Sequence, residues 1–86
     1  MANGCQDGHI CFYEEPEYNG NLETHEGTPS GIRNLDQIPL AKSVHNWTGD
    51  DVLLYTGRDG EGDSFPLAAD NSRRNSKPIR SYSAIG

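Results

Sequence analysis

The stretch that most constrains the fold is residues 10–20. It opens with alternating apolar and β-prone residues, which is typical of a strand, and then meets two turn signals within a few positions, Pro16 and a terminal Asn-Gly pair. A strand that must reverse so soon predicts a hairpin. Tyr13 and Tyr18 bracket the bend, so one ring can cover the opposite strand, while Gly20 can adopt a backbone conformation that a Cβ would forbid.

The length and composition of the chain favour a single all-β domain, residues 1–86. A chain of 86 residues buries about two thirds of its unfolded surface, which allows one thin core. The hydrophobic content is 33%, with ten glycines, five prolines and no apolar run of ten residues. This pattern excludes a membrane span and argues against long helices.

The two cysteines, Cys5 and Cys11, enclose a short segment in which Gly8 gives the flexibility that a close approach needs. We interpret them as one disulfide. The alternatives are two free thiols or a redox pair, although the spacing is too long for a C-x-x-C motif and a zinc site lacks a second ligand pair. A disulfide indicates an oxidising compartment. Since residues 1–4 lack the basic and apolar regions of a signal peptide, we expect a mature secreted form.

Charge is unevenly distributed along the chain. The net charge is −6, and residues 1–36 carry seven acids against Arg33 alone. Residues 71–86 carry four cations and no acid. The acidic body argues against nucleic acid as a partner. The basic end is either ordinary solvated surface or a docking patch.

Turn-forming segments at regular intervals divide the chain into short predicted strands, a pattern typical of a β-sandwich or barrel. The predicted strands are 10–14, 21–25, a short piece near Ile32, 42–47, 51–56, 64–67 and 80–85. Turns are predicted at 27–31, 48–50, 59–62 and 69–78.

The sequence also resembles itself. A shift of 42 places residues 10–13 on 52–55 and Gly20 on Gly62, and a shift of 38 places residues 42–44 on 80–82. We therefore predict two copies of one unit, residues 1–48 and 49–86. They would form two Greek-key motifs packed as a β-sandwich, because neither unit can bury its apolar face alone.

These residues carry a resemblance to a known superfamily. Tyr13, Tyr18, Gly20 and Ser43 resemble the Greek-key signature of the β/γ-crystallins. Its second copy is represented by Tyr55, Gly62 and Ser81, with Gly60 in place of the second aromatic residue. The pattern is most similar to the secreted bacterial peptidase inhibitors of crystallin fold, the metalloproteinase-inhibitor type. The residues that match this branch are Cys5, Gly8, Cys11, Phe12, Tyr13, Glu14, Tyr18, Gly20, Ser43, Val44, Asn46, Thr48, Leu54 and Tyr55.

The resemblance raises the question of calcium, which many crystallin domains bind just before the last strand of each unit. Oxygen ligands are required there, but the hydroxyl position holds a cation in both copies, Lys42 and Arg80. A cation in the place of a divalent ion repels it. We therefore predict no metal at these sites, and we assign no cofactor. The acids at 59–63 lack the downstream glutamate of an EF-hand and are read as a solvated turn, although a weak ion contact there stays open.

Catalysis finds little support in the sequence. His9, His25 and His45 are never paired at ligand spacing, and both cysteines are assigned to the bridge. We expect no enzyme activity. Trp47 is expected to cover the seam between the units, the alternative being a binding anchor, and Asn46-Trp47-Thr48 matches a glycosylation sequon.

Binding by an extended segment is the remaining possibility. Within residues 62–68, an extended loop is predicted, and its candidate protease-binding residues are Ser64, Phe65, Pro66 and Leu67. Thermolysin-type enzymes accept a bulky apolar residue such as Phe65, and Pro66 fixes its own φ. The alternative is that Phe65 and Leu67 are core residues. The inhibitor branch braces this region with a second disulfide, which this sequence lacks.

We predict a secreted, monomeric binding module whose partner is a secreted protease, with no nucleic-acid or membrane partner. The competing hypothesis is a purely structural domain, such as an envelope or coat component.

Overall fold

The computed structural model describes residues 5–27 and 31–85. Within these two ranges, eight strands follow one another: β1 (His9–Glu15), β2 (Asn19–Glu26), β3 (Ile32–Asn34), β4 (Ser43–Asn46), β5 (Val52–Tyr55), β6 (Ser64–Leu67), β7 (Ser72–Arg73) and β8 (Ser81–Ala84). Two short 3₁₀ turns, η1 (Pro16–Tyr18) and η2 (Arg58–Gly60), lie inside the β1–β2 and β5–β6 hairpins. The described residues form no α-helix.

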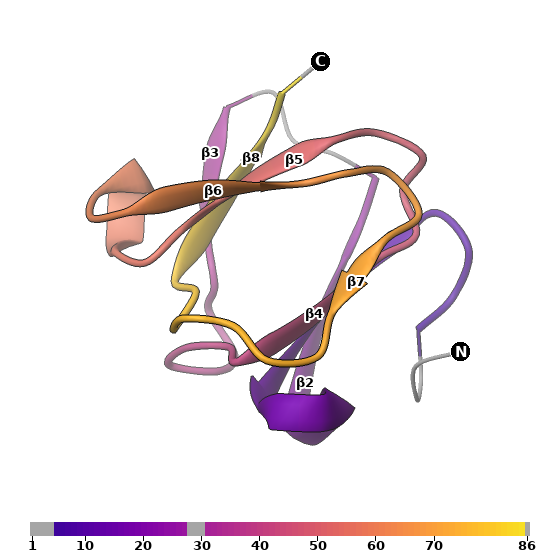
Figure 1. The fold of residues 1–86 in the computed structure, drawn as a ribbon, viewed down its shortest axis with the longest axis horizontal. Coiled ribbons are helices and arrows are strands. Elements are labelled where there is room, and N and C mark those ends of the chain that lie inside the picture. Colours follow the sequence, from indigo (N-terminus) through magenta and orange to yellow (C-terminus); the bar gives the residue numbers. More distant parts are fainter. Residues whose placement is uncertain (1–4, 28–30, 86) are drawn as a thin grey trace.

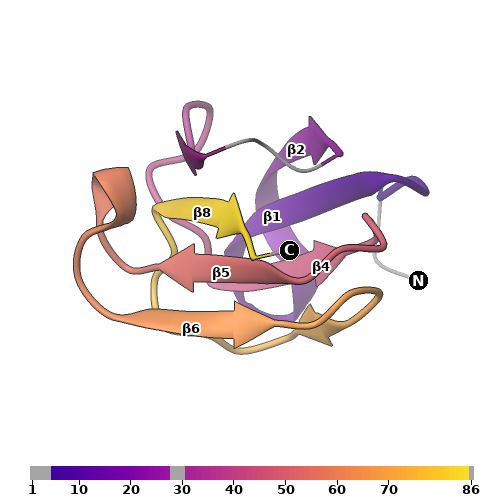
Figure 2. The same ribbon diagram turned by 90° about the horizontal axis from the view of Figure 1, so that it is seen from above.

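The strands form two antiparallel sheets that pack as a sandwich (Figure 1). The first sheet has the order β2-β1-β4-β7 and the second the order β3-β8-β5-β6. Each sheet therefore takes three strands from one half of the chain and one strand from the other half. Two Greek-key motifs packed as a sandwich are the fold predicted from the sequence, whereas the exchange of one strand between the sheets was not predicted. Seen from above, β8, β5 and β6 lie side by side in one layer, with β1, β2 and β4 in the other (Figure 2).

Strand β7 was not predicted, because residues 69–78 have the composition of a turn. Arg73 pairs with Val44 and Ser72 with His45, so β7 closes the edge of the first sheet beside β4. Both residues of β7 are exposed. A two-residue polar strand has no apolar alternation, so its place comes from the pairing partner rather than from its own sequence.

The core lies between the sheets and is built from the inward residues of each strand. Alternation along β1 directs Ile10 and Phe12 inward, and the same holds for Val52 and Leu54 of β5. The crossing segments contribute further apolar anchors. The buried members of this cluster are Ile10, Phe12, Leu35, Ile38, Ala41, Val44, Val52, Leu54, Leu67, Ile79 and Tyr82.

The first hairpin is clasped by aromatic rings and a buried serine. The rings of Tyr13 and Tyr18 meet edge to face, with 5.5 Å between their centroids. The Ser43 hydroxyl donates to the carbonyl of Glu15 at 2.7 Å and accepts from the amide of Tyr18 at 3.0 Å. Gly20 has a φ of +82°, which favours glycine. The predicted folded hairpin is therefore present.

The second hairpin repeats this geometry without the second aromatic residue. The Ser81 hydroxyl donates to the carbonyl of Gly57 at 2.6 Å and accepts from the amide of Gly60 at 3.0 Å. A Cβ on Gly60 would lie 2.5 Å from Ile32 Cδ1 and 3.7 Å from Tyr55 Cζ. The side chain of Ile32, from the other half of the chain, thus lies next to Gly60, the position that corresponds to Tyr18 in the first hairpin.

Candidate functional site

The four candidate binding residues lie in β6, at the edge of the second sheet. Leu67 is buried in the core and Phe65 is half-buried against it, whereas Ser64 and Pro66 are exposed. Their main chain pairs with β5 through residues 52–55. The segment is thus an edge strand rather than a projecting loop.

Among the described residues, no strand pairs with the outer side of β6, and Pro66 limits the hydrogen bonds that this side can make. Phe65 pairs with Leu54, and the amide of Thr56 donates to the carbonyl of Asp63 two positions along. In an antiparallel ladder, hydrogen-bonded residue pairs alternate with pairs that are not hydrogen-bonded. The backbone N–H and C=O groups of Phe65 therefore point toward β5, and the backbone groups of Ser64 and Pro66 point away from the sheet. Proline has no N–H, so this part of the edge presents one amide donor, that of Ser64.

A hollow lies beside β6, where the edges of the two sheets approach each other. Its volume is about 150 Å³, and it is lined by Asp63, Ser64, Phe65, Arg73 and Lys77. The guanidinium of Arg73, from β7, lies 4.9 Å from the centre of the Phe65 ring. This cation–π contact holds a positive charge over an apolar surface.

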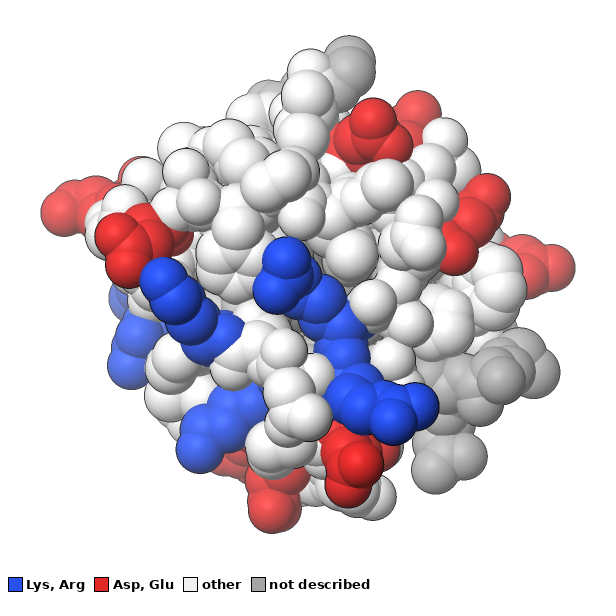
Figure 3. All heavy atoms as spheres, in the orientation of Figure 1, with Lys and Arg blue, Asp and Glu red and all other residues white. Residues whose placement is uncertain are grey.

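Cations gather on this side of the molecule. Arg73, Arg74 and Lys77, which we call the basic face, are all exposed. In Figure 3, Lys and Arg side chains extend from the left edge across the centre of the face to its lower part, and most acidic side chains lie toward the rim. The basic end predicted from the sequence is therefore folded against the candidate strand.

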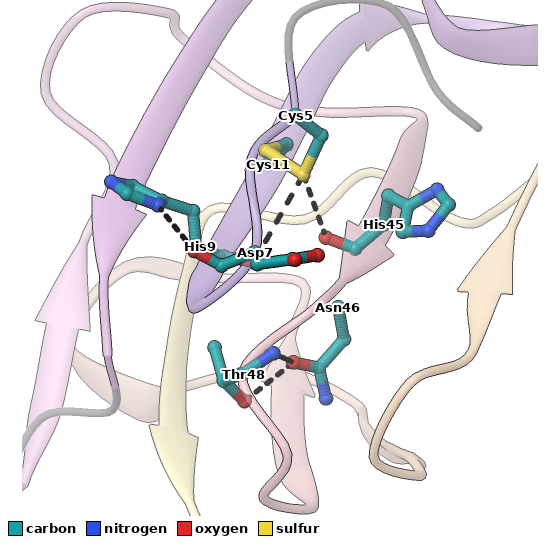
Figure 4. Close-up of a disulfide and its surroundings, with 7 residues drawn as sticks. All are labelled: Cys5, Asp7, His9, Cys11, His45, Asn46 and Thr48. Carbon is teal, nitrogen blue, oxygen red and sulfur yellow. Dashed lines mark hydrogen bonds between the residues drawn. A yellow bond between two sulfur atoms is a disulfide. The ribbon is translucent and has the colours of Figure 1, made fainter.

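The predicted disulfide joins Cys5 and Cys11 on the outer face of the first sheet (Figure 4). The Cα atoms are 5.8 Å apart, and Cys5 Sγ lies 3.9 Å from the carbonyl oxygens of His9 and His45. Around the bridge lies a second apolar cluster. Its members are Cys5, Cys11 and Tyr13, with Tyr18, Leu22 and Trp47 packed against them.

Trp47 belongs to this outer cluster and does not cover the seam between the units. Its ring lies 4.6 Å from that of His45, which is itself nearly buried, and burial lowers the pKa of His45. The expectation from the sequence was wrong because Trp47 follows β4 on the outward side of the strand, next to His45. The tryptophan thus shields the disulfide face.

The sequon asparagine is part of the fold. Asn46 is fully buried, and its side-chain amide donates to the carbonyls of Asp50 at 2.8 Å and Ala68 at 3.3 Å. Its side-chain oxygen accepts from the amide and the hydroxyl of Thr48 (Figure 4). A side chain held in this way is unavailable for glycosylation in the folded protein.

Glu23 is a structurally important residue that sequence reasoning missed. Its side chain is 2% exposed, and its carboxylate accepts hydrogen bonds from the amides of Asp36, Gln37 and Ile38 at 2.6–3.1 Å. His25 Nε2 lies 2.6 Å from the same carboxylate. Burial acts to raise the pKa of Glu23, but these hydrogen bonds outweigh it and the pKa is lowered.

The cations at the crystallin calcium positions can be placed in part. The guanidinium of Arg80 donates to the carbonyl of Thr56 at 2.7 Å, whereas Lys42 is exposed. The described residues contain no group of three or more His, Cys, Asp or Glu side chains able to hold a metal ion. Across residues 5–27 and 31–85, no helix has the length and apolar character needed to cross a membrane.

Comparison with solved structures defines the class of protein to which this sandwich belongs. The chain is similar to a structure described as "Evolution of the eye lens beta-gamma-crystallin domain fold", with a TM-score of 0.70, 12% identity, and coverage of 99% of this chain and 92% of that one. It is also similar to a beta gamma crystallin from Ciona intestinalis, with a TM-score of 0.69, 16% identity, and coverage of 91% and 100%. A third is the fifth crystallin domain of the non-lens protein Absent in melanoma 1, with a TM-score of 0.67, 20% identity, and coverage of 92% and 88%. The fold is that of the β/γ-crystallins.

Within this fold the family can be stated. Residues 1–67 match the model of peptidase inhibitor family I36, and the chain belongs to that family. No curated protein matches it by sequence. The family match indicates a peptidase-inhibitor module of crystallin fold, with a protease as partner.

Proposed function

We propose that this protein is a secreted inhibitor of a secreted metalloprotease of the thermolysin type. The observation that carries the proposal is the match of residues 1–67 to peptidase inhibitor family I36. We further propose one domain, residues 1–86, composed of two Greek-key units, 1–48 and 49–86. The Cys5–Cys11 disulfide is consistent with an extracellular location.

The contact with the protease is proposed to be made by β6, through Ser64, Pro66 and the half-buried Phe65, while Leu67 anchors the strand in the core. An edge strand already has the extended backbone in which peptidases bind peptides. Because β6 is paired with β5 in the folded protein, little conformational entropy is lost when it binds. The exposed Ser64 and Pro66 lie on one face of this strand. Pro66 limits pairing with other strands, which protects the free edge from aggregation.

Kinetic measurement with thermolysin and a chromogenic peptide substrate tests this proposal. We expect saturable inhibition at micromolar inhibitor or below. Pro66→Lys, on the exposed face of β6, should weaken inhibition, and the matched control is Thr24→Lys on the exposed face of β2, at the edge of the other sheet. No inhibition by the folded wild-type protein would favour the structural-domain hypothesis. Equal inhibition by both variants would place the contact elsewhere.

A further inference from the structure

The basic face and the hollow beside β6 form a surface whose chemistry favours one kind of partner. The chain carries a net charge of −6, yet residues 71–86 hold four cations and no acid. Two of these cations, Arg73 and Lys77, line the hollow together with the half-buried Phe65, Ser64 and a single acid, Asp63. A positive site on an otherwise acidic protein selects for negative charge in its partner.

The cations of the hollow are available for a new contact. Lys77 Nζ lies 3.6 Å from the Asp63 carboxylate, but these side chains are 68% and 75% exposed. An ion pair so exposed is weak, so Lys77 can exchange Asp63 for another carboxylate. Arg73 is held over the Phe65 ring, which orients the guanidinium before a ligand arrives.

The backbone of β6 limits what else the surface can bind. The backbone groups of Ser64 and Pro66 point outward from β6, and only Ser64 has an N–H to donate. A long strand added to this edge would therefore lack a backbone hydrogen bond at Pro66. Affinity must come from side chains next to the edge, where Arg73 and Lys77 lie. The site therefore suits a short extended segment that carries carboxylates.

We propose that the hollow formed by Phe65, Arg73 and Lys77, beside the edge strand β6, binds an acidic extended segment on the surface of the target peptidase. The segment lies along β6 near Ser64, and its carboxylates contact Arg73 and Lys77. This inference rests on the proposed function for the nature of the partner. It adds a charge requirement that inhibition alone does not imply.

Neutralisation of single cations tests the charge requirement in the inhibition assay. Lys77→Gln and Arg73→Gln should each weaken inhibition of thermolysin about two- to fivefold, chiefly through the association rate. The matched control is Arg33→Gln on β3, at the opposite edge of the second sheet, which should leave inhibition unchanged. Raising the salt concentration from about 0.05 M to about 0.5 M should remove the difference, because exposed charges are then screened.

A peptide assay tests the site without the protease. A hexapeptide of alternating glutamate and valine, with blocked ends, should shift the amide resonances of Ser64, Phe65 and Arg73, and its glutamine counterpart should not. If thermolysin is not inhibited but the acidic peptide binds, the proposed function fails and the site stands. If inhibition occurs while Lys77→Gln matches Arg33→Gln and the acidic peptide leaves these resonances unchanged, the inference is overturned. Salt-dependent self-association of this acidic chain, abolished by Lys77→Gln, would assign the site to a second copy and would also overturn it.

Discussion

At the scale of single residues, Glu23 is the clearest case of a polar side chain that stabilises the fold. Its carboxylate accepts hydrogen bonds from three successive backbone amides, those of residues 36–38. These bonds fix the segment that places Leu35 and Ile38 in the core. Four donors converge on one buried anion, counting His25. Charge-assisted hydrogen bonds of this kind are stronger than neutral ones.

Replacing Glu23 by glutamine should therefore destabilise the protein by about 2–3 kcal/mol, since an amide keeps one acceptor oxygen and sets its own donors against the backbone donors. The free energy of urea-induced unfolding measures the effect. The control is Glu26→Gln, on the same strand and exposed, which should change stability by less than about 0.5 kcal/mol. Equal effects of both substitutions would contradict the anchoring role.

The same carboxylate predicts how stability depends on pH. Because the pKa of Glu23 is lowered in the folded protein, the unfolded chain takes up the proton first as the pH falls below the ordinary value of 4.5. The stabilisation is fully present above that value and is lost as the pH falls through the lowered pKa. Unfolding free energies of the wild type and Glu23→Gln, measured at a series of pH values, should converge in acid and diverge near neutrality.

At the scale of the elements, the two serine clasps are the feature that both hairpins share. Ser43 and Ser81 are each fully buried, and each hydroxyl makes two hydrogen bonds to its own folded hairpin. We expect Ser43→Ala and Ser81→Ala to cost about 1–3 kcal/mol each, because in each hairpin a partly buried backbone amide and carbonyl lose the hydroxyl that pairs with them. Thermal unfolding measures this, with the exposed Ser72→Ala as control. A substitution at Ser81 that is as mild as that at Ser72 would show that the second clasp does not stabilise its hairpin.

The second hairpin depends also on a glycine that the first does not have. Gly60→Ala should be more destabilising than Gly49→Ala, although φ is positive at both sites, +76° and +82°. A Cβ at Gly49 would have nothing within 4 Å, so that variant has only the backbone strain of about 1 kcal/mol, whereas Gly60→Ala also displaces Ile32. Denaturant midpoints compare the two variants. Adding Ile32→Ala to Gly60→Ala should recover part of the extra loss, and no recovery would argue against Ile32 as the filling side chain.

The cations before the last strands predict the response to calcium. Because Arg80 donates to the carbonyl of Thr56, a divalent ion at that position would have to displace a guanidinium. We expect calorimetric titration with millimolar calcium to give no saturable binding, and the thermal midpoint to be the same in calcium and in chelator. Arg80→Ser, which restores a hydroxyl, is the informative variant. Saturable micromolar binding by the wild type would refute the prediction.

At the scale of the whole molecule, the fold could be predicted because its signals are periodic and repeated. The alternation in residues 10–13 and 52–55 gives the strand faces, and the repeated Tyr, Gly and Ser positions give the two Greek keys. Glu23 and β7 could not be predicted in this way. The carboxylate of Glu23 meets amides 13–15 residues along the chain, and β7 is defined by its partner β4. Neither long-range contact leaves a local pattern in the sequence.

The candidate site shows the same limit. Residues 64–67 were correctly predicted as extended, because of their position after a glycine-rich turn, and the edge place of β6 came only from the sheet order. The proximity of Arg73 and Lys77 to Phe65 depends on how residues 68–80 return across the sandwich edge. The basic cluster and the apolar strand could be predicted from the sequence only as separate features. That they lie side by side is a consequence of the tertiary fold.

The Cys5–Cys11 disulfide, on the first sheet, is expected to stabilise the whole sandwich. It closes a short loop on the outer face of the first sheet, where Tyr13 and Trp47 pack around it. In the chain-entropy model a loop of this length contributes about 2 kcal/mol, a large part of the stability expected for a domain of this size. The double substitution Cys5→Ala and Cys11→Ala should lower the thermal midpoint by about 10 °C. Reductant should lower the midpoint of the wild type by a similar amount and leave the variant unchanged. If the variant instead keeps the wild-type midpoint, packing within the second apolar cluster holds this face without the bridge, and the bridge adds no measurable stability to the fold.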